Sequence, residues 1–151
     1  MKTLLLALSF LIALQFSGYC QKTNDTSAEK ITQIRYDFVS GAKYGTDRHL
    51  SITRDSIIYH SRMNYYDLSV RIHIPNRPDL WPDLVKLINL EEFDKIKNGE
   101  SEVNSDGSDE YITVQTSVKS HKEVNGRLYN NSINSLKDKL KNIISDLKNY
   151  L

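Results

Sequence analysis

The sequence predicts an α+β domain in which an antiparallel sheet of about six strands has two helices packed on one face. Apolar and polar residues alternate over much of residues 31–75 and 111–118, and a period of two is typical of strands with one buried face. Apolar residues three and four apart occupy residues 80–96 and 133–150, and this spacing is typical of helices. Helices on one face of such a sheet bury all of these apolar stripes in one core.

The start of the chain differs in composition from the rest. Lys2 is the only charged residue among residues 1–20, and an apolar run covers residues 4–14. A positive start followed by an apolar run is typical of a secretory signal peptide, and the run is shorter than the about 20 apolar residues that span a membrane. The sequence therefore predicts a signal peptide over residues 1–20, a flexible polar tether over residues 21–29 and a single α+β domain over residues 30–151.

Cys20 and Gln21 mark the predicted processing site. Cleavage after Cys20 would leave the small residues Gly18 and Cys20 before the cut and Gln21 at the start of a free exported protein. The alternative is lipidation of Cys20, as in bacterial lipoproteins, which would anchor the protein to the cell envelope. A lipobox usually has a small residue just before its cysteine, whereas Tyr19 stands there. Cleavage is therefore predicted, and because Cys20 is the only cysteine, the domain has no disulfide.

The first four strands are predicted between residues 31 and 75. The first contains Ile34, Tyr36 and Phe38 and ends at a glycine-containing loop. Two shorter apolar runs around residues 50–52 and 57–59 follow, with a turn between them. The fourth strand ends at Pro75, because proline donates no hydrogen bond to a neighbouring strand. Its two predicted faces are Tyr66, Leu68, Val70, Ile72 and Ile74 on one side and Asp67, Ser69, Arg71 and His73 on the other.

Helices and further strands are predicted after this proline. A helix is expected to begin at Asp79, whose side chain can cap it, with Pro82 in its first turn. A further helical turn is expected over residues 90–97. The remaining elements are a strand over residues 111–119, a weak strand over residues 124–129 with a hairpin or a bulge at its Asn-Gly pair, and a final helix over residues 133–150.

Charge excludes one class of partner and favours another. Without residues 1–20 the chain loses only Lys2 from its 20 basic residues and keeps all 19 acidic ones, so its net charge is near zero. Such a chain does not recruit nucleic acid by its overall charge. Arginines concentrate in residues 48–77, and a basic sheet face would suit an acidic protein partner. We predict a protein partner, no nucleic acid, and membrane contact only if Cys20 is lipidated. The tyrosines expected near this face are Tyr59, Tyr65, Tyr66 and Tyr111.

The sequence indicates no catalytic, cofactor-binding or metal-binding residue. The four histidines lack the short spacing that brings metal ligands onto one strand or helix face, and we interpret them as surface residues. No Gly-x-Ser-x-Gly elbow for a nucleophilic serine is present. The leading hypothesis is a non-enzymatic binding protein, periplasmic or secreted, without a cofactor. Two alternatives stay open: an envelope hydrolase whose site assembles from scattered residues such as His49, His60 and His73, and a lipid-anchored structural protein held by Cys20.

The order of the predicted elements provides one further comparison. Its features are the glycine-containing loop over residues 41–45, the helix over residues 81–87 that leads into residues 89–96, the strand over residues 111–118 and the final helix. In this order they resemble a large set of small exported bacterial proteins without an assigned function and, more distantly, emfourin-type inhibitors of metalloproteases. The resemblance covers most of residues 30–151. It implies protease inhibition as one form of binding, through the exposed sheet face or the loop over residues 41–45, and assigns no inhibitory residue.

Overall fold

The computed structural model describes residues 29–121, 124–125, 131–147 and 149. The predicted signal peptide, the processing site at Cys20 and Gln21, and the tether up to residue 28 lie outside the described residues. Within the described ranges, no helix combines the length and the apolar character that crossing a membrane requires. The described residues therefore belong almost entirely to the predicted α+β domain.

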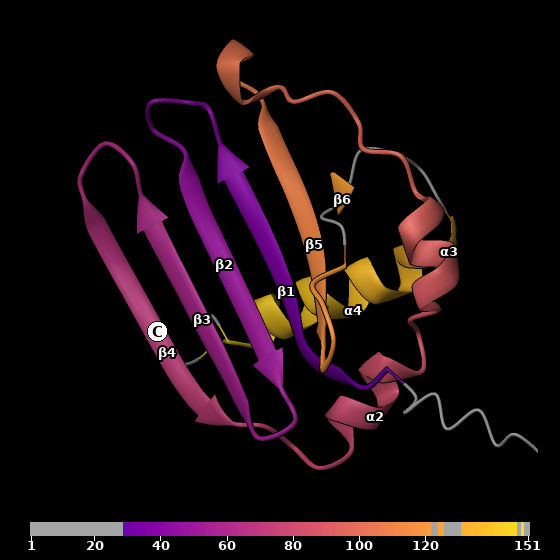
Figure 1. Ribbon diagram of the computed structural model, residues 1–151. Helices are drawn as coiled ribbons and strands as arrows, with labels where there is room; N and C mark the ends of the chain where they lie inside the picture. Colours follow the sequence, from indigo (N-terminus) through magenta and orange to yellow (C-terminus); the bar gives the residue numbers. More distant parts are fainter. Residues whose placement is uncertain (1–28, 122–123, 126–130, 148, 150–151) are drawn as a thin grey trace, which may run out of the picture.

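One antiparallel sheet forms the framework of this domain. Its strands are β1 (Ile31–Ser40), β2 (Thr46–Thr53), β3 (Ser56–Met63), β4 (Leu68–Pro75), β5 (Ser108–Thr116) and the two-residue β6 (Val124–Asn125). Their order across the sheet is β4-β3-β2-β1-β5-β6 (Figure 1). β1 lies inside the sheet, where it pairs with β2 on one side and with β5 on the other. β4 is the first strand in this order and lies at an edge of the sheet. Of the predicted weak strand, residues 126–129 lie outside the described residues.

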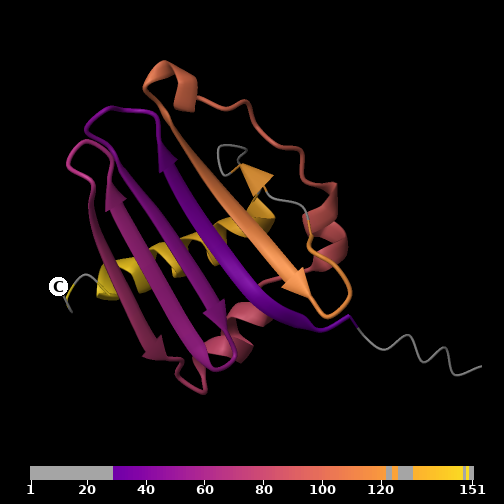
Figure 2. The same cartoon turned by 60° about the vertical axis from the view of Figure 1, so that its left-hand side comes forward.

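The helices are α2 (Leu80–Val85), α3 (Leu90–Lys95) and α4 (Asn131–Leu147). α4 crosses one face of the sheet diagonally, with α2 and α3 beside it (Figures 1 and 2). The predicted α+β class with an antiparallel sheet is confirmed, whereas the predicted count of two helices is wrong. The chain leaves helical geometry after α2, and Asn89 starts α3, where its side chain accepts a hydrogen bond from the Glu92 amide at 3.2 Å.

The core lies between the sheet and α4. Every second residue of the strands points into it, as the alternation in the sequence predicts. From α4, Leu136 and Leu140 enter the same core and are almost completely buried. The buried sheet residues are Ile31, Ile34, Tyr36, Leu50, Ile52, Ile57, Tyr59, Ile112 and Val114, and α2 and α3 add Leu80, Trp81, Leu84 and Phe93.

One charged group joins β5 to α4 at the border of this core. Glu110 of β5 forms ion pairs with Lys137 and, at 2.7 Å, with Lys141. Burial raises the pKa of Glu110, but the hydrogen bonds and the positive charges of the two lysines together outweigh burial and leave that pKa below its ordinary value. The carboxylate therefore stays ionised at neutral pH and holds the helix on the sheet.

The glycine-containing loop after β1 is held by backbone contacts. The Gly41 amide donates a hydrogen bond to the Gly107 carbonyl at 2.8 Å. A Cβ atom at Gly41 would lie 1.7 Å from the carbonyl oxygen of Val103, so a side chain cannot fit there without moving the backbone. The close approach fixes this loop against residues 102–107. Beyond it, Tyr44 is 64% exposed.

Candidate functional site

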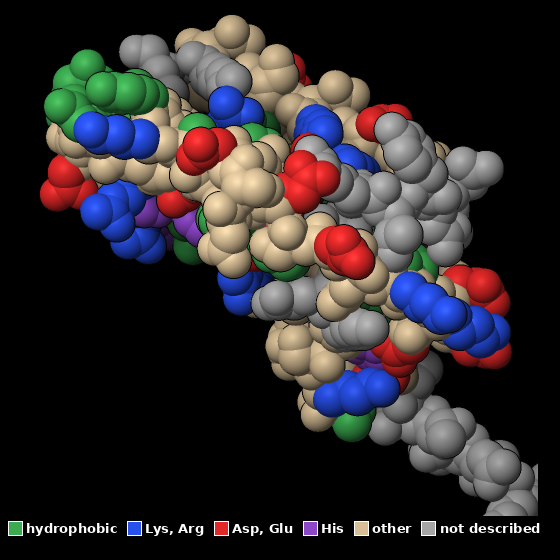
Figure 3. Space-filling model, turned by 90° about the horizontal axis from the view of Figure 1, so that it is seen from above, with side chains coloured by type: hydrophobic (Ala, Val, Ile, Leu, Met, Phe, Trp, Pro, Cys, Tyr) green, Lys and Arg blue, Asp and Glu red, His purple; other side chains and the backbone are tan. Residues whose placement is uncertain are grey.

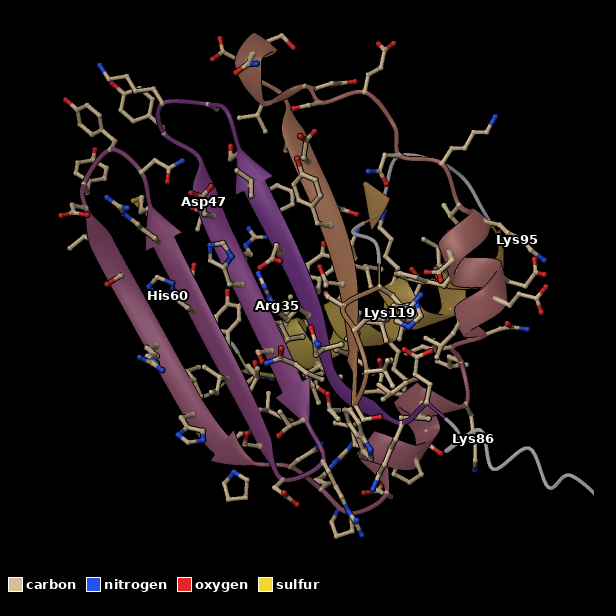
Figure 4. The ribbon with its side chains drawn as sticks, viewed as in Figure 1. Arg35, Asp47, His60, Lys86, Lys95 and Lys119 are labelled. Carbon is tan, nitrogen blue, oxygen red and sulfur yellow. The ribbon has the colours of Figure 1, made fainter. Side chains whose placement is uncertain are left out.

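The second face of the sheet is covered by none of the described helices (Figures 1 and 2), and we call it the open face. Polar side chains form a row across its middle. Asp37 of β1 lies opposite His49 of β2, His49 lies opposite His60 of β3, and His60 lies opposite Arg71 of β4. Arg35 and His60 face the same side of the sheet (Figure 4). The row therefore assembles from four consecutive strands, β1 to β4.

Direct contacts order the centre of this row. His49 Nδ1 lies 2.8 Å from Asp37 Oδ1, and Arg35 Nη2 donates a hydrogen bond to Asp37 Oδ2 at 3.1 Å. The rings of His49 and His60 are stacked, with 5.9 Å between their centroids and 17° between their planes. These contacts restrict the rotamers of the side chains and reduce the entropy that a partner would have to remove on binding.

On the open face two carboxylates are buried and a third, Asp47 of β2, is partly exposed, whereas several basic groups face outward. Asp37 is 6% exposed, and Asp109 of β5 is completely buried. The Tyr111 hydroxyl donates a hydrogen bond to Asp109 Oδ2 at 2.7 Å, and the Glu102 amide donates one to Oδ1 at 3.0 Å. In contrast, the side chains of Arg35 and His49 are nearly half exposed. Arg71 and His73 are also exposed. We call Arg35, His49, His60, Arg71 and His73 the basic row.

The chemistry of the basic row is that of hydrogen-bond donors and positive charge. His49 contacts Asp37, but the described residues place no hydroxyl in hydrogen-bond contact with His49. Ser51, on the same strand, accepts a hydrogen bond from Gln33 Nε2 at 2.8 Å instead. Within the described ranges, no three His, Cys, Asp or Glu residues are placed to hold a metal ion. The arrangement can therefore bind anionic groups without further assembly.

The structure places the four histidines in two environments. His49, His60 and His73 share the open face, so the residues named for the hydrolase alternative do lie near one another. Their proximity comes from strand pairing, which chain spacing does not reveal. The prediction that all four are surface residues is wrong for His121, which is 3% exposed.

His121 joins two distant parts of the chain. Its Nδ1 lies 2.8 Å from Asp94 Oδ1, and its Nε2 lies 3.1 Å from Glu29 Oε1. The Thr116 hydroxyl also donates to Glu29, at 2.6 Å. The pKa of Glu29 is lowered by the Thr116 hydrogen bond and then by His121, and the pKa of Asp94 is lowered by its hydrogen bond to His121. His121 therefore links the segment before β1 to α3 through two carboxylates.

An exposed aromatic cluster lies at the end of the sheet where the β1–β2 and β3–β4 loops meet. The Tyr65 ring lies 4.6 Å from that of Tyr44 and 4.9 Å from that of Tyr66, between centroids. Lys43 Nζ lies 4.9 Å from the centroid of Tyr65, within the range of a cation–π interaction. Figure 3 shows hydrophobic side chains gathered at this end beside lysine and arginine.

The other two tyrosines predicted near the basic sheet face, Tyr59 and Tyr111, lie outside this aromatic cluster. Tyr111 lies on the open face, as expected for a tyrosine beside the basic residues. Tyr59 does not, because it is 1% exposed and belongs to the core. Its neighbour on β2, Leu50, is also a core residue, and opposed residues of an antiparallel pair point to the same face. The prediction for Tyr59 is therefore wrong.

Comparison with known proteins adds no family to these observations. No family model matches the chain, and no curated protein matches it.

Proposed function

We propose that this is an exported, non-enzymatic binding protein whose basic row binds an acidic segment of a partner protein. The observation that carries the proposal is the arrangement of charge on the open face. Asp37 is buried, whereas its partners Arg35 and His49 are nearly half exposed, and Arg71 and His73 are exposed on the same face. A partner that presents carboxylates there would form complementary contacts, which speed association and fix orientation.

Export is the part of the proposal that rests on the sequence. The apolar run of residues 4–14 and the small residues before Gln21 support cleavage after Cys20 and a periplasmic or secreted protein. The intact mass of the protein isolated from its native envelope tests this. The mass of a chain that starts at Gln21 would agree with the proposal. A mass that includes acyl chains on Cys20 would show that the protein is a lipoprotein.

The strength of such binding depends on several contacts acting together. One exposed ion pair contributes only about 0.2–1 kcal/mol, so a single carboxylate would bind weakly. Charges separated by more than about 8 Å are largely screened at physiological ionic strength. The affinity is therefore expected to fall as salt is added, and a partner needs a run of acidic groups.

Fluorescence anisotropy with a labelled poly-L-glutamate peptide tests the basic row. Replacing Arg71 by glutamine should weaken binding by up to about fivefold, the value of one exposed ion pair. The double variant R35Q/R71Q should weaken it further. R71Q leaves the contacts of Asp37 with Arg35 and His49 unchanged, so its effect does not depend on any rearrangement around that buried carboxylate.

The matched control is the double variant R54Q/R77Q, which removes the same charge from exposed positions outside the basic row. It should retain most of the affinity. Equal weakening by both double variants would mean that only net charge matters, and tight binding of poly-L-lysine would contradict the proposal directly. Substrate turnover that disappears in His49→Gln would favour the hydrolase instead. Protease inhibition stays a prediction from the resemblance, and no contact described above supports it.

A further inference from the structure

β4 is an edge strand without the features that usually protect such an edge. It pairs with β3 over its whole length, from Leu68 opposite Met63 to Pro75 opposite Ser56, without a register shift. Among the described strands, none pairs with its other side. Natural edges are commonly blocked by several charges, by a bulge or by proline within the strand. In β4, Arg71 is the only Lys, Arg, Asp or Glu residue, and the one proline, Pro75, is the last residue of the strand.

The helix side of β4 is apolar and only partly covered. Leu68 is 63% exposed and Val70 is 39% exposed, whereas Ile72 and Ile74 are partly buried. The cover comes from the end of α4, since Leu147 and Asn149 line one hollow together with Ile74. The apolar surface that begins at Leu68 continues into Met63, its exposed neighbour on β3. An added strand would cover this surface with every second side chain.

The other side of β4 is basic. Arg71 and His73 face the open side of the sheet and are exposed, and His60 lies beside Arg71 on β3. Side chains of an added strand that point to this side would lie directly opposite Arg71 and His73. Opposite charges in such cross-strand pairs are favourable, and like charges are unfavourable. The two sides of β4 therefore favour a partner strand in which acidic and apolar residues alternate.

The same charges disfavour a second copy of this chain. Residues that lie opposite each other in an antiparallel pair point to the same face. When β4 pairs with β4 in the two registers centred on the strand, Arg71 lies opposite either Arg71 or His73. Both of these arrangements put a basic residue opposite a basic residue, because the two edges that meet in a symmetric dimer are identical.

We infer that β4 binds an extended segment of a partner protein as an added strand, with acidic side chains opposite Arg71 and His73 and apolar side chains beside Leu68 and Val70. The inference rests on the proposed function for the acidic character of the partner. It goes further because it names the binding mode, in which backbone hydrogen bonds provide affinity and alternate side chains provide specificity.

Two peptides of identical composition test this mode on the mature chain. In one, glutamate alternates with valine, and in the other the glutamates form one block. The proposed function alone predicts that the blocked peptide, which has a run of acidic groups, binds at least as tightly as the alternating one. Strand addition predicts about tenfold tighter binding of the alternating peptide, because only that order covers Leu68 and Val70. N-methylation of the backbone at alternate residues should abolish binding when the methyl groups face β4 and preserve it when they face away.

The double variant L68Q/V70T tests the apolar side, and both positions are exposed enough to change without disturbing the core. It should lose the preference for the alternating peptide and keep the affinity for the blocked one. Val118→Gln is the control, because Val118 is 70% exposed and lies outside β4; it should retain the preference.

Three results would overturn the inference. Equal binding of the two peptides that is insensitive to L68Q/V70T would exclude strand addition while leaving the proposed function in place. The absence of binding to either peptide would count against both proposals. A dimer in sedimentation experiments that disappears in L68Q/V70T would make the occupant a second copy of this chain.

Discussion

His121 lies between two carboxylates, and this makes its contribution to stability dependent on pH. The pKa of Glu29 lies below its ordinary 4.5 because of Thr116 and His121, and the pKa of Asp94 lies below its ordinary 3.8 because of His121, with Lys119 adding to both shifts. Carboxylates with a lowered pKa stabilise the folded state fully above their unfolded pKa values and lose this effect as the pH falls through the folded values.

The expected outcome is a fall in the urea midpoint as the pH is lowered from 6 through about 4.5 and below. In His121→Gln the fall should be smaller, because Asp94 loses the main cause of its lowered pKa and Glu29 loses the cause that ranks after Thr116. His73→Gln is the control, since His73 is exposed on the open face and should leave the slope unchanged. Identical slopes for wild type and His121→Gln would contradict this account of the cluster.

Residue positions of this kind are only partly visible in the sequence. The alternation of residues 34–38 correctly places Ile34 and Tyr36 in the core. It cannot place His121, whose partners Glu29 and Asp94 are 92 and 27 residues away. The sequence does not show the contact between His49 and His60 either, because that contact depends on the register between β2 and β3.

At the scale of elements, two residues in equivalent positions allow a direct comparison of helix capping. Asn89 caps α3 through its side chain, whereas Asp79 precedes α2 without a side-chain cap hydrogen bond. Replacing Asn89 by alanine should therefore lower the free energy of unfolding by about 1 kcal/mol. Asp79→Ala should change it by less than about 0.5 kcal/mol, as is usual for an exposed position. Urea unfolding measures both, and equal effects would mean that the Asn89 cap contributes nothing.

This pair also shows where reading elements from a sequence succeeds and fails. The sequence identifies the position of α2 and names Asp79 as its cap, but the cap bond is absent because the Asp79 backbone is helical, with φ −81° and ψ −28°. The fourth strand begins at Leu68 rather than Tyr66, since Asp67 adopts a left-handed φ of 51°. Such backbone angles depend on the turn that the whole sheet imposes.

At the scale of the molecule, the buried residues of the sheet and of the helices belong to one cluster. A single core predicts a single cooperative unfolding transition. Trp81, the only tryptophan, belongs to α2 and lies in this core, so its fluorescence reports packing while far-UV circular dichroism reports the strands and helices. The two urea transitions should coincide. An earlier fluorescence transition would show that α2 separates from the sheet before the rest unfolds.

The overall architecture was the most predictable level. Period-two and helical patterns predict the order of strands and helices because burial requires them. These patterns do not predict which part of the sheet the helices cover. α4 leaves the Leu68 end of β4 exposed. The apolar alternation of residues 68–74 would be the same if a helix covered them. The charge of the open face is also hidden, because the net charge of the chain near zero does not indicate that Asp37 and Asp109 are buried.

The contact between Glu29 and His121 also places the point at which the preceding residues join the domain. Glu29 stands just before β1, whose ten residues span about 33 Å and lead to the loop that bears Tyr44. The eight residues 21–28 reach at most about 30 Å. If Cys20 were lipidated, this short linker would join the domain at one end of the sheet. The tyrosines at the opposite end would then face away from the membrane.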